Sequence, residues 1–119
     1  MNRILIIDKN IDDLNKYHSE LVEDGYEIQK SSTREEGLES LSRDKSLDLV
    51  LLGMETGSEG GFQLLRDIRK KQPEIPILLL CEHTNFKRDF RSWLADDYLT
   101  KTSNIESLKI KVKEMIEGS

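Results

Sequence analysis

Three short, almost unbroken apolar runs constrain the fold of this chain more than any other feature. They occupy residues 4–7, 47–52 and 75–80, and a shorter run follows at residues 98–99. A strand with one face in water alternates apolar and polar residues, whereas a parallel strand buried on both faces is apolar throughout. The runs therefore predict buried parallel strands, and residues 27–31, which follow Gly25, are a weaker strand candidate.

Amphipathic helical patterns fill the stretches between these runs. In residues 10–24, Asn10 is suited to cap a helix and Gly25 to end it. Asp12 and Asp13 in its first turn favour the helix dipole. Four more helical patterns follow along the chain. Two begin at the capping boxes Thr33-x-x-Glu36 and Ser103-x-x-Glu106, and the other two cover residues 62–68 and 86–94.

Strand and helix thus alternate five times along the chain. Alternation of this kind is typical of a parallel sheet with helices on both faces. We expect an α/β fold with a doubly wound five-stranded parallel sheet, in the (βα)5 flavodoxin-like order 2-1-3-4-5. The length of 119 residues suits one domain over residues 1–119.

Composition narrows the classes of function. The chain has 18 basic and 23 acidic residues, and a net charge of −5 disfavours direct nucleic-acid binding. Its single cysteine, Cys81, excludes an internal disulfide and a cysteine-rich metal site. The apolar runs are too short to span a membrane, and the first residues lack a signal peptide's long apolar segment. We therefore expect a cytoplasmic protein without membrane contact.

The carboxyl ends of the strands mark where a site is expected. In a doubly wound sheet, ligands bind outside these ends, near the point where the strand order reverses. The ends carry Asp8 and Lys9, Gly53, Cys81, and Lys101. We expect these residues to surround one pocket.

Five segments match one known family in order and spacing. They are residues 3–8, 48–52, 61–65, 75–80 and 95–101, the last reading Ala-Asp-Asp-Tyr-Leu-Thr-Lys. On these segments the chain resembles the receiver domains of bacterial two-component response regulators. The resemblance implies a pocket in which two acidic residues hold Mg²⁺ and an aspartate accepts a phosphoryl group. A Ser or Thr and a Lys contact the phosphoryl oxygens in that family.

Position by position, the resemblance is partial. Asp8 stands at the first acidic position, Lys101 at the lysine position, and Tyr98 where an aromatic changes rotamer with activation. The chain therefore resembles a degenerate, or pseudo-receiver, form. Its departures are Lys9 at the second acidic position, Gly53 at the acceptor position and Cys81 at the Ser/Thr position.

These departures remove most of the expected chemistry. An acyl phosphate requires a carboxylate nucleophile, which Gly53 lacks. Mg²⁺ requires several oxygen ligands, whereas Asp8, Lys9 and Lys101 sum to a net positive charge that repels it. We expect no cofactor, no metal site, and weak or absent Mg²⁺ binding. Lys9 either pairs with Asp8 as a built-in cation or is an ordinary solvated lysine.

Other chemistry stays open at this point. Glu55 and Glu82 lie near enough in sequence to accept a phosphoryl group, or Lys9 and Lys101 hold another anion near Glu55. Cys81 is either a redox-sensitive thiolate near Lys101 or a small apolar filler. A flavodoxin-like cofactor-binding domain is a further alternative, although the loop after the first strand lacks the donors that bind flavin phosphate.

Without such chemistry, the function is expected on a surface. The leading hypothesis is a phosphorylation-independent protein-interaction module in two-component, phosphorelay-type signalling, with no enzymatic activity. In the family, the fourth helix, fifth strand and fifth helix form a face that often mediates dimerisation or output. Opposite charges there suit a two-fold contact, so we expect a protein partner, an output domain or a homodimer. The candidate interaction residues are Lys87, Arg88, Arg91, Asp96, Asp97, Lys109 and Lys113.

Overall fold

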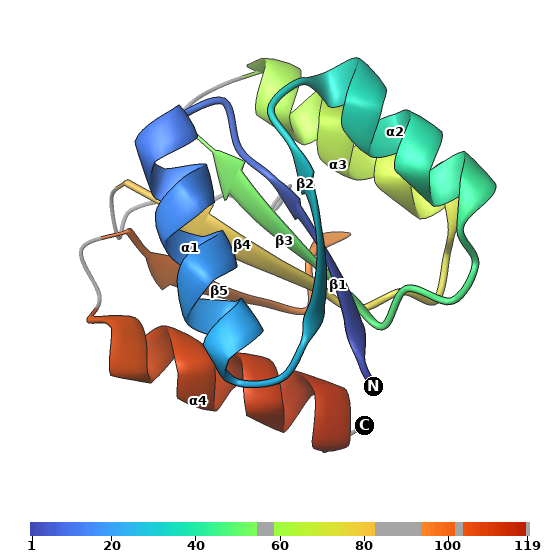
Figure 1. Ribbon diagram of the computed structural model, residues 1–119. Coiled ribbons are helices and arrows are strands. Elements are labelled where there is room, and N and C mark those ends of the chain that lie inside the picture. The colour runs from blue at the N-terminus through green and yellow to red at the C-terminus, as the bar shows by residue number, and fades with distance from the viewer. Residues whose placement is uncertain (55–58, 83–93, 102–103, 119) are drawn as a thin grey trace.

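The computed structural model describes residues 1–54, 59–82, 94–101 and 104–118 (Figure 1). One parallel sheet runs in the order β2-β1-β3-β4-β5, which confirms the predicted doubly wound fold. No helix in the described ranges is long and apolar enough to cross a membrane. The strands are β1 (Arg3–Ile7), β2 (Glu27–Ser31), β3 (Leu49–Met54), β4 (Ile77–Cys81) and β5 (Asp97–Thr100). The helices are α1 (Ile11–Glu23), α2 (Arg34–Arg43), α3 (Glu59–Lys71) and α4 (Ile105–Glu117). The helix predicted over residues 86–94 lies almost wholly outside the described residues.

Alternate residues of each strand face opposite sides of the sheet, which explains why the strand runs are apolar throughout. In β1, Leu5 and Ile7 pack on the side covered by α2 and α3. Ile4 and Ile6 pack on the side covered by α1 and α4. Figure 1 shows these two helix pairs on opposite faces of the sheet. Burial on both faces is the main stabilising term, at about 1.5–3 kcal/mol for each large apolar side chain.

Local capping explains where the helices begin. Asn10 accepts a hydrogen bond from the Asp13 amide at 3.0 Å, and Thr33 caps α2 in the same way, so both predicted caps are confirmed. The cap predicted at Ser103 is wrong, because α4 begins one residue later. There the side chain of Asn104 accepts from the Ser107 amide at 2.8 Å. Asn and Ser are equally good caps, so the local sequence does not distinguish the two positions.

Arg69 of α3 holds the chain where it enters β5. Its guanidinium donates to the carbonyls of Leu94 and Ile75 at 2.7 and 2.6 Å. It also pairs with Asp96 at 2.7 Å, and the same Asp96 oxygen accepts from the Ile77 amide at 2.7 Å. Asp96, which the sequence suggests for an interaction surface, is thus part of the hydrogen bonding that joins α3, β4 and β5.

Candidate functional site at the carboxyl edge of the sheet

The strand register places Asp8 beside Gly53. Ile7 in β1 lies opposite Leu52 in β3, so the next residue of each strand continues at the same edge. The Asp8 amide donates to the Ser31 carbonyl of β2 at 3.1 Å, which keeps Asp8 in line with its strand. The site is therefore built where β1 ends beside the last residues of β3, at the point where the strand order reverses.

Lys101 connects the end of β5 to β1 and α1. Its backbone amide donates to the Cys81 carbonyl at 2.6 Å and so extends the pairing of β4 with β5. Its ammonium lies 3.2 and 2.9 Å from Oδ1 and Oδ2 of Asp8, and 3.0 Å from Oδ2 of Asp13. The Asp8 side chain is 4% exposed and that of Lys101 14%, so water screens this ion pair poorly.

The two carboxylates keep Lys101 charged in spite of its burial. Burial alone would lower the pKa of an ammonium, but the hydrogen bonds to Asp8 and Asp13 outweigh it and raise the pKa of Lys101. A divalent cation between these carboxylates would have to displace that ammonium. Within the described ranges, no group of three or more His, Cys, Asp or Glu side chains is placed to hold a metal ion.

Gly53 faces the Asp8 carboxylate at close range. A Cβ atom on Gly53 would overlap Oδ2 of Asp8. Among the described glycines, only Gly25 has a positive φ, so the backbone at Gly53 does not require glycine. The missing side chain at position 53 therefore supplies space and not conformational freedom.

Lys9 does not provide the cation for Asp8, and that hypothesis is wrong. The Lys9 side chain is exposed, and the ion-pair partner of Asp8 is Lys101. Successive residues along an extended chain point to opposite sides, so a lysine directly after Asp8 is poorly placed to reach its carboxylate. A lysine from another strand end is better placed, and Lys9 is the ordinary solvated lysine of the alternative reading.

Two residues of α1 belong to the site, although their sequence pattern marks only a helix. Asp13 lies in the first turn of α1, as expected, but its carboxylate also binds Lys101. Tyr17 lies one turn later and is buried, and burial together with the Asp13 carboxylate raises its pKa to about 12. The i,i+4 spacing of Asp13 and Tyr17 puts both on one helix face, which is the signal that could have found them.

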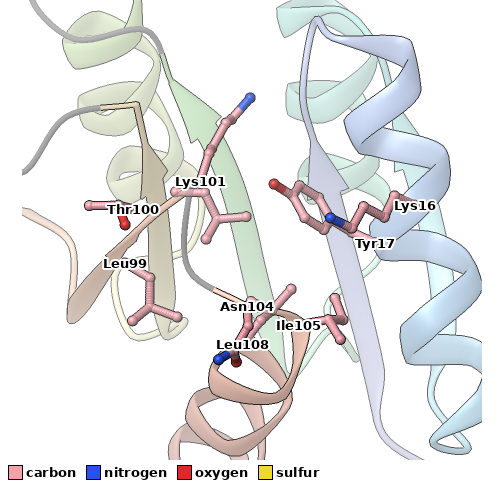
Figure 2. Close-up of a pocket in the computed structure, with 9 residues that line it drawn as sticks. Lys16, Tyr17, Leu99, Thr100, Lys101, Asn104, Ile105 and Leu108 are labelled. Carbon is pink, nitrogen blue, oxygen red and sulfur yellow. The ribbon is translucent and has the colours of Figure 1, made fainter.

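A small cavity lies beside Lys101. In Figure 2 the Tyr17 hydroxyl points toward Lys101 from the α1 side. The cavity volume of about 10 Å³ admits about one water molecule. This space is too small to hold a flavin. The lining residues are Lys16, Tyr17, Leu80, Leu99, Thr100, Lys101, Asn104, Ile105 and Leu108.

Cys81 presents its carbonyl to Lys101 and buries its thiol. The residue is 1% exposed and belongs to the core on the α2 and α3 side of the sheet. Burial raises the pKa of the Cys81 thiol to about 11, although the charge of Lys101 opposes this. A protonated, buried thiol is unreactive, so the structure favours the apolar filler over the redox sensor.

Several residues suggested for an interaction surface have partners within the chain. Asp97 pairs with Lys111 of α4 at 2.8 Å. Lys109 faces the other side of α4, where it lies 3.0 Å from Glu20 and 3.6 Å from Asp24 of α1. The charges of Asp97 and Lys109 are therefore both compensated within the chain.

Other suggested residues are exposed or lie beyond the described ranges. Tyr98 is 39% exposed, and Lys113 and Glu82 are exposed as well. The exposed ring of Tyr98 and the ammonium of Lys113 stay available for contact with another molecule. The suggested residues Glu55, Lys87, Arg88 and Arg91 lie outside the described residues.

Comparison with known sequences identifies one family. The profile of the response regulator receiver domain matches residues 4–113. The transcriptional regulatory protein CiaR of Streptococcus pneumoniae is 30% identical over 123 residues, which cover 100% of this chain and 53% of CiaR. The transcriptional regulatory protein GlrR of Escherichia coli is 31% identical over 80 residues, which cover 67% of this chain and 18% of GlrR.

Solved structures agree with the sequence matches. The response regulator TrrA of Thermotoga maritima, solved in complex with Mg²⁺-BeF, has a TM-score of 0.86 and 36% identity, covering 97% of this chain and 99% of that one. A receiver domain of Methanospirillum hungatei has a TM-score of 0.88 and 26% identity, covering 99% and 95%.

The fold and the position of the site define a receiver of two-component signalling. The chain belongs to the response regulator receiver domain family. It spans about half the length of CiaR and 18% of GlrR.

Proposed function

We propose that this receiver domain works by protein contact and does not accept a phosphoryl group. The observation that carries the proposal is the end of β3, where Gly53 offers no carboxylate and the space beside it is filled by Asp8. Asp8 is a poor substitute nucleophile, because its oxygens already accept hydrogen bonds from Lys101 and from the Asn10 amide.

The proposal includes weak or absent Mg²⁺ binding. The residues present do not fit the metal that the family implies, because the ammonium of Lys101 lies between the Asp8 and Asp13 carboxylates. Two carboxylates that share one built-in cation leave a net charge of only −1 to attract a divalent ion. No step of the proposed function depends on a metal.

The proposed output is binding of a protein partner or an output domain, in the cytoplasm. CiaR and GlrR are transcriptional regulatory proteins, which supports a place in a signalling chain. The face of β5 and α4 is the proposed contact surface, with exposed Tyr98, Ile110 and Lys113. A homodimer through this face is one form of the same proposal.

The test is a pair of ¹⁵N-HSQC spectra of the uniformly labelled domain, recorded with and without Mg²⁺ and beryllofluoride. We expect the resonances of Asp8, Gly53 and Lys101 to stay in place. TrrA, whose complex with Mg²⁺-BeF is known, is the positive control under identical conditions. Large shifts confined to this edge of the sheet would refute the proposal.

A second experiment detects covalent transfer directly. The domain is incubated with Mg²⁺ and acetyl phosphate, and its intact mass is measured beside that of TrrA. We expect a phosphoryl adduct on TrrA and none on this chain. An adduct located by peptide sequencing on Glu55 or Glu82 would establish the residual-receiver alternative instead.

A further inference from the structure

Gly53 occupies a position that glycine does not need for its backbone. Its φ is not in the left-handed region, in contrast to that of Gly25. In a strand interior, glycine is usually unfavourable because it adds chain entropy and packs no side chain. The reason for glycine must therefore be sought in what surrounds its Cα, and there the nearest group is the carboxylate of Asp8.

We infer that Gly53 and Asp8 form a coupled pair that creates a permanent ion-pair cluster. We call this cluster the clamp; it consists of the Lys101 ammonium with the carboxylates of Asp8 and Asp13. The missing side chain at position 53 leaves the volume into which the Asp8 carboxylate turns. From there Asp8 binds the Lys101 ammonium through both oxygens, at 3.2 and 2.9 Å. Asp8 thereby becomes the carboxylate partner of Lys101. Glycine at position 53 thus has two effects: it removes the carboxylate that would accept a phosphoryl group, and it leaves the space that this ion pair requires.

The clamp joins segments that are far apart in the sequence. Lys101 is 93 residues from Asp8 and 88 from Asp13, so it ties the end of β5 to the end of β1 and the first turn of α1. The Asn10 amide donates to Asp8 at 2.9 Å and adds the loop between β1 and α1. Lys101 also precedes Asn104, the cap of α4, so the clamp constrains the point from which α4 starts.

The clamp contains no group that an outside signal can readily change. Its charges are an ammonium and two carboxylates held close together, and a switch needs a ligand that distinguishes two states. The inference rests on the proposed function and deepens it by naming the contacts that fill the site at the carboxyl edge of the sheet. The test below measures the energetic coupling between Asp8 and Gly53. The inference can therefore be refuted even if the domain accepts no phosphoryl group, as the proposed function states.

The test is a double-mutant cycle on the full chain, with the urea midpoint as the readout. The variants are Gly53→Ala, Asp8→Ala and the double variant. We expect Gly53→Ala to lower the midpoint in the parent, because the new Cβ displaces the Asp8 carboxylate. In the Asp8→Ala background the same change should leave the midpoint unchanged or raise it, because the volume is vacant and alanine restricts the unfolded chain.

The matched control is Asp12→Ala, which removes an exposed carboxylate from the first turn of α1, four residues after Asp8. In that background Gly53→Ala should lower the midpoint by as much as in the parent. Equal effects of Gly53→Ala in the parent and Asp8→Ala backgrounds would overturn the inference.

A direct measurement on the unmodified protein covers the case in which a variant fails to fold. In a ¹⁵N spectrum selective for lysine ammonium groups, Lys101 should give a signal protected from exchange with water. The conservative variant Asp8→Asn, which preserves shape, should abolish that protection, whereas Asp12→Asn should not. If the Lys101 ammonium of the unmodified protein exchanges with water as fast as the ammonium groups of the solvent-exposed lysines, the inference is refuted.

Discussion

Replacing Lys101 with methionine keeps most of the side-chain volume and removes the ammonium that pairs with Asp8. The Asp8 side chain is 4% exposed, so its carboxylate stays buried and keeps the Asn10 amide as a hydrogen-bond donor. Breaking a buried pair by removing one partner costs about 3–5 kcal/mol, because an uncompensated charge remains. Since single domains have about 5–15 kcal/mol of total stability, the loss should be large.

The chain offers a matched control in Lys111→Met. The Lys111–Asp97 distance is 2.8 Å, against 2.9 Å for Lys101–Asp8, so the two pairs differ little in geometry. They differ in burial, because the side chains of Lys111 and Asp97 are 27% and 35% exposed. A pair that water reaches contributes about 0–1 kcal/mol. Lys111→Met should therefore cost several-fold less than Lys101→Met.

Equilibrium urea unfolding at pH 7 measures both losses. Equal losses for the two variants would refute the argument that an unpaired buried charge causes the larger one.

Three further predictions follow from local contacts. A Cβ at Gly37 would lie 2.5 Å from Cδ1 and 2.9 Å from Cγ1 of Ile7, so Gly37→Ala should cost about 1–3 kcal/mol through overpacking. In an Ile7→Ala background, which removes both of these atoms, the sign should reverse, because alanine's helix propensity is worth about 1 kcal/mol. Asn104→Ala should cost about 1 kcal/mol as a lost cap, and an equal cost for Ser103→Ala would contradict the cap assignment. Burial raises the pKa of Cys81 from 9.0 to about 11, so between these pH values the folded thiol keeps its proton while the unfolded chain loses it. Stability should fall by about 3 kcal/mol as the pH rises through this window, and a Cys81→Ala protein that loses as much would disprove that origin.

Much of the fold was predictable because it depends on local patterns. Strands buried on both faces must be apolar at every position, so the runs that became β1, β3 and β4 were recognisable without any knowledge of their neighbours. The side chains of Asn10 and Thr33 cap helices by accepting hydrogen bonds from amides three residues later. A spacing of three residues can be recognised in the sequence alone. The carboxyl edge was predictable for the same reason, since a parallel sheet brings every strand end to one side.

The pairing within the site was not predictable in this way. Lys9 is adjacent to Asp8 in sequence, whereas the actual partner of Asp8 is 93 residues away. Asp13 has an adequate local explanation as a first-turn acid, and its spacing to Tyr17 indicates only a shared helix face, not the cation Lys101 that Asp13 binds. Which cation meets which carboxylate depends on the relative positions of β1, β5 and α1.

The alternation of strands and helices, the edge at which the strands end, and the absence of a carboxylate at position 53 can all be read from the amino-acid sequence. Each of these follows from residue types and from spacings of a few residues. The folded arrangement of β1, β5 and α1 was needed to show that Lys101 is shared by Asp8 and Asp13, and that Gly53 leaves space for the Asp8 carboxylate. Steric overlap and Coulomb attraction depend on distances of a few ångströms, and between residues far apart in the chain those distances exist only after the sheet has formed.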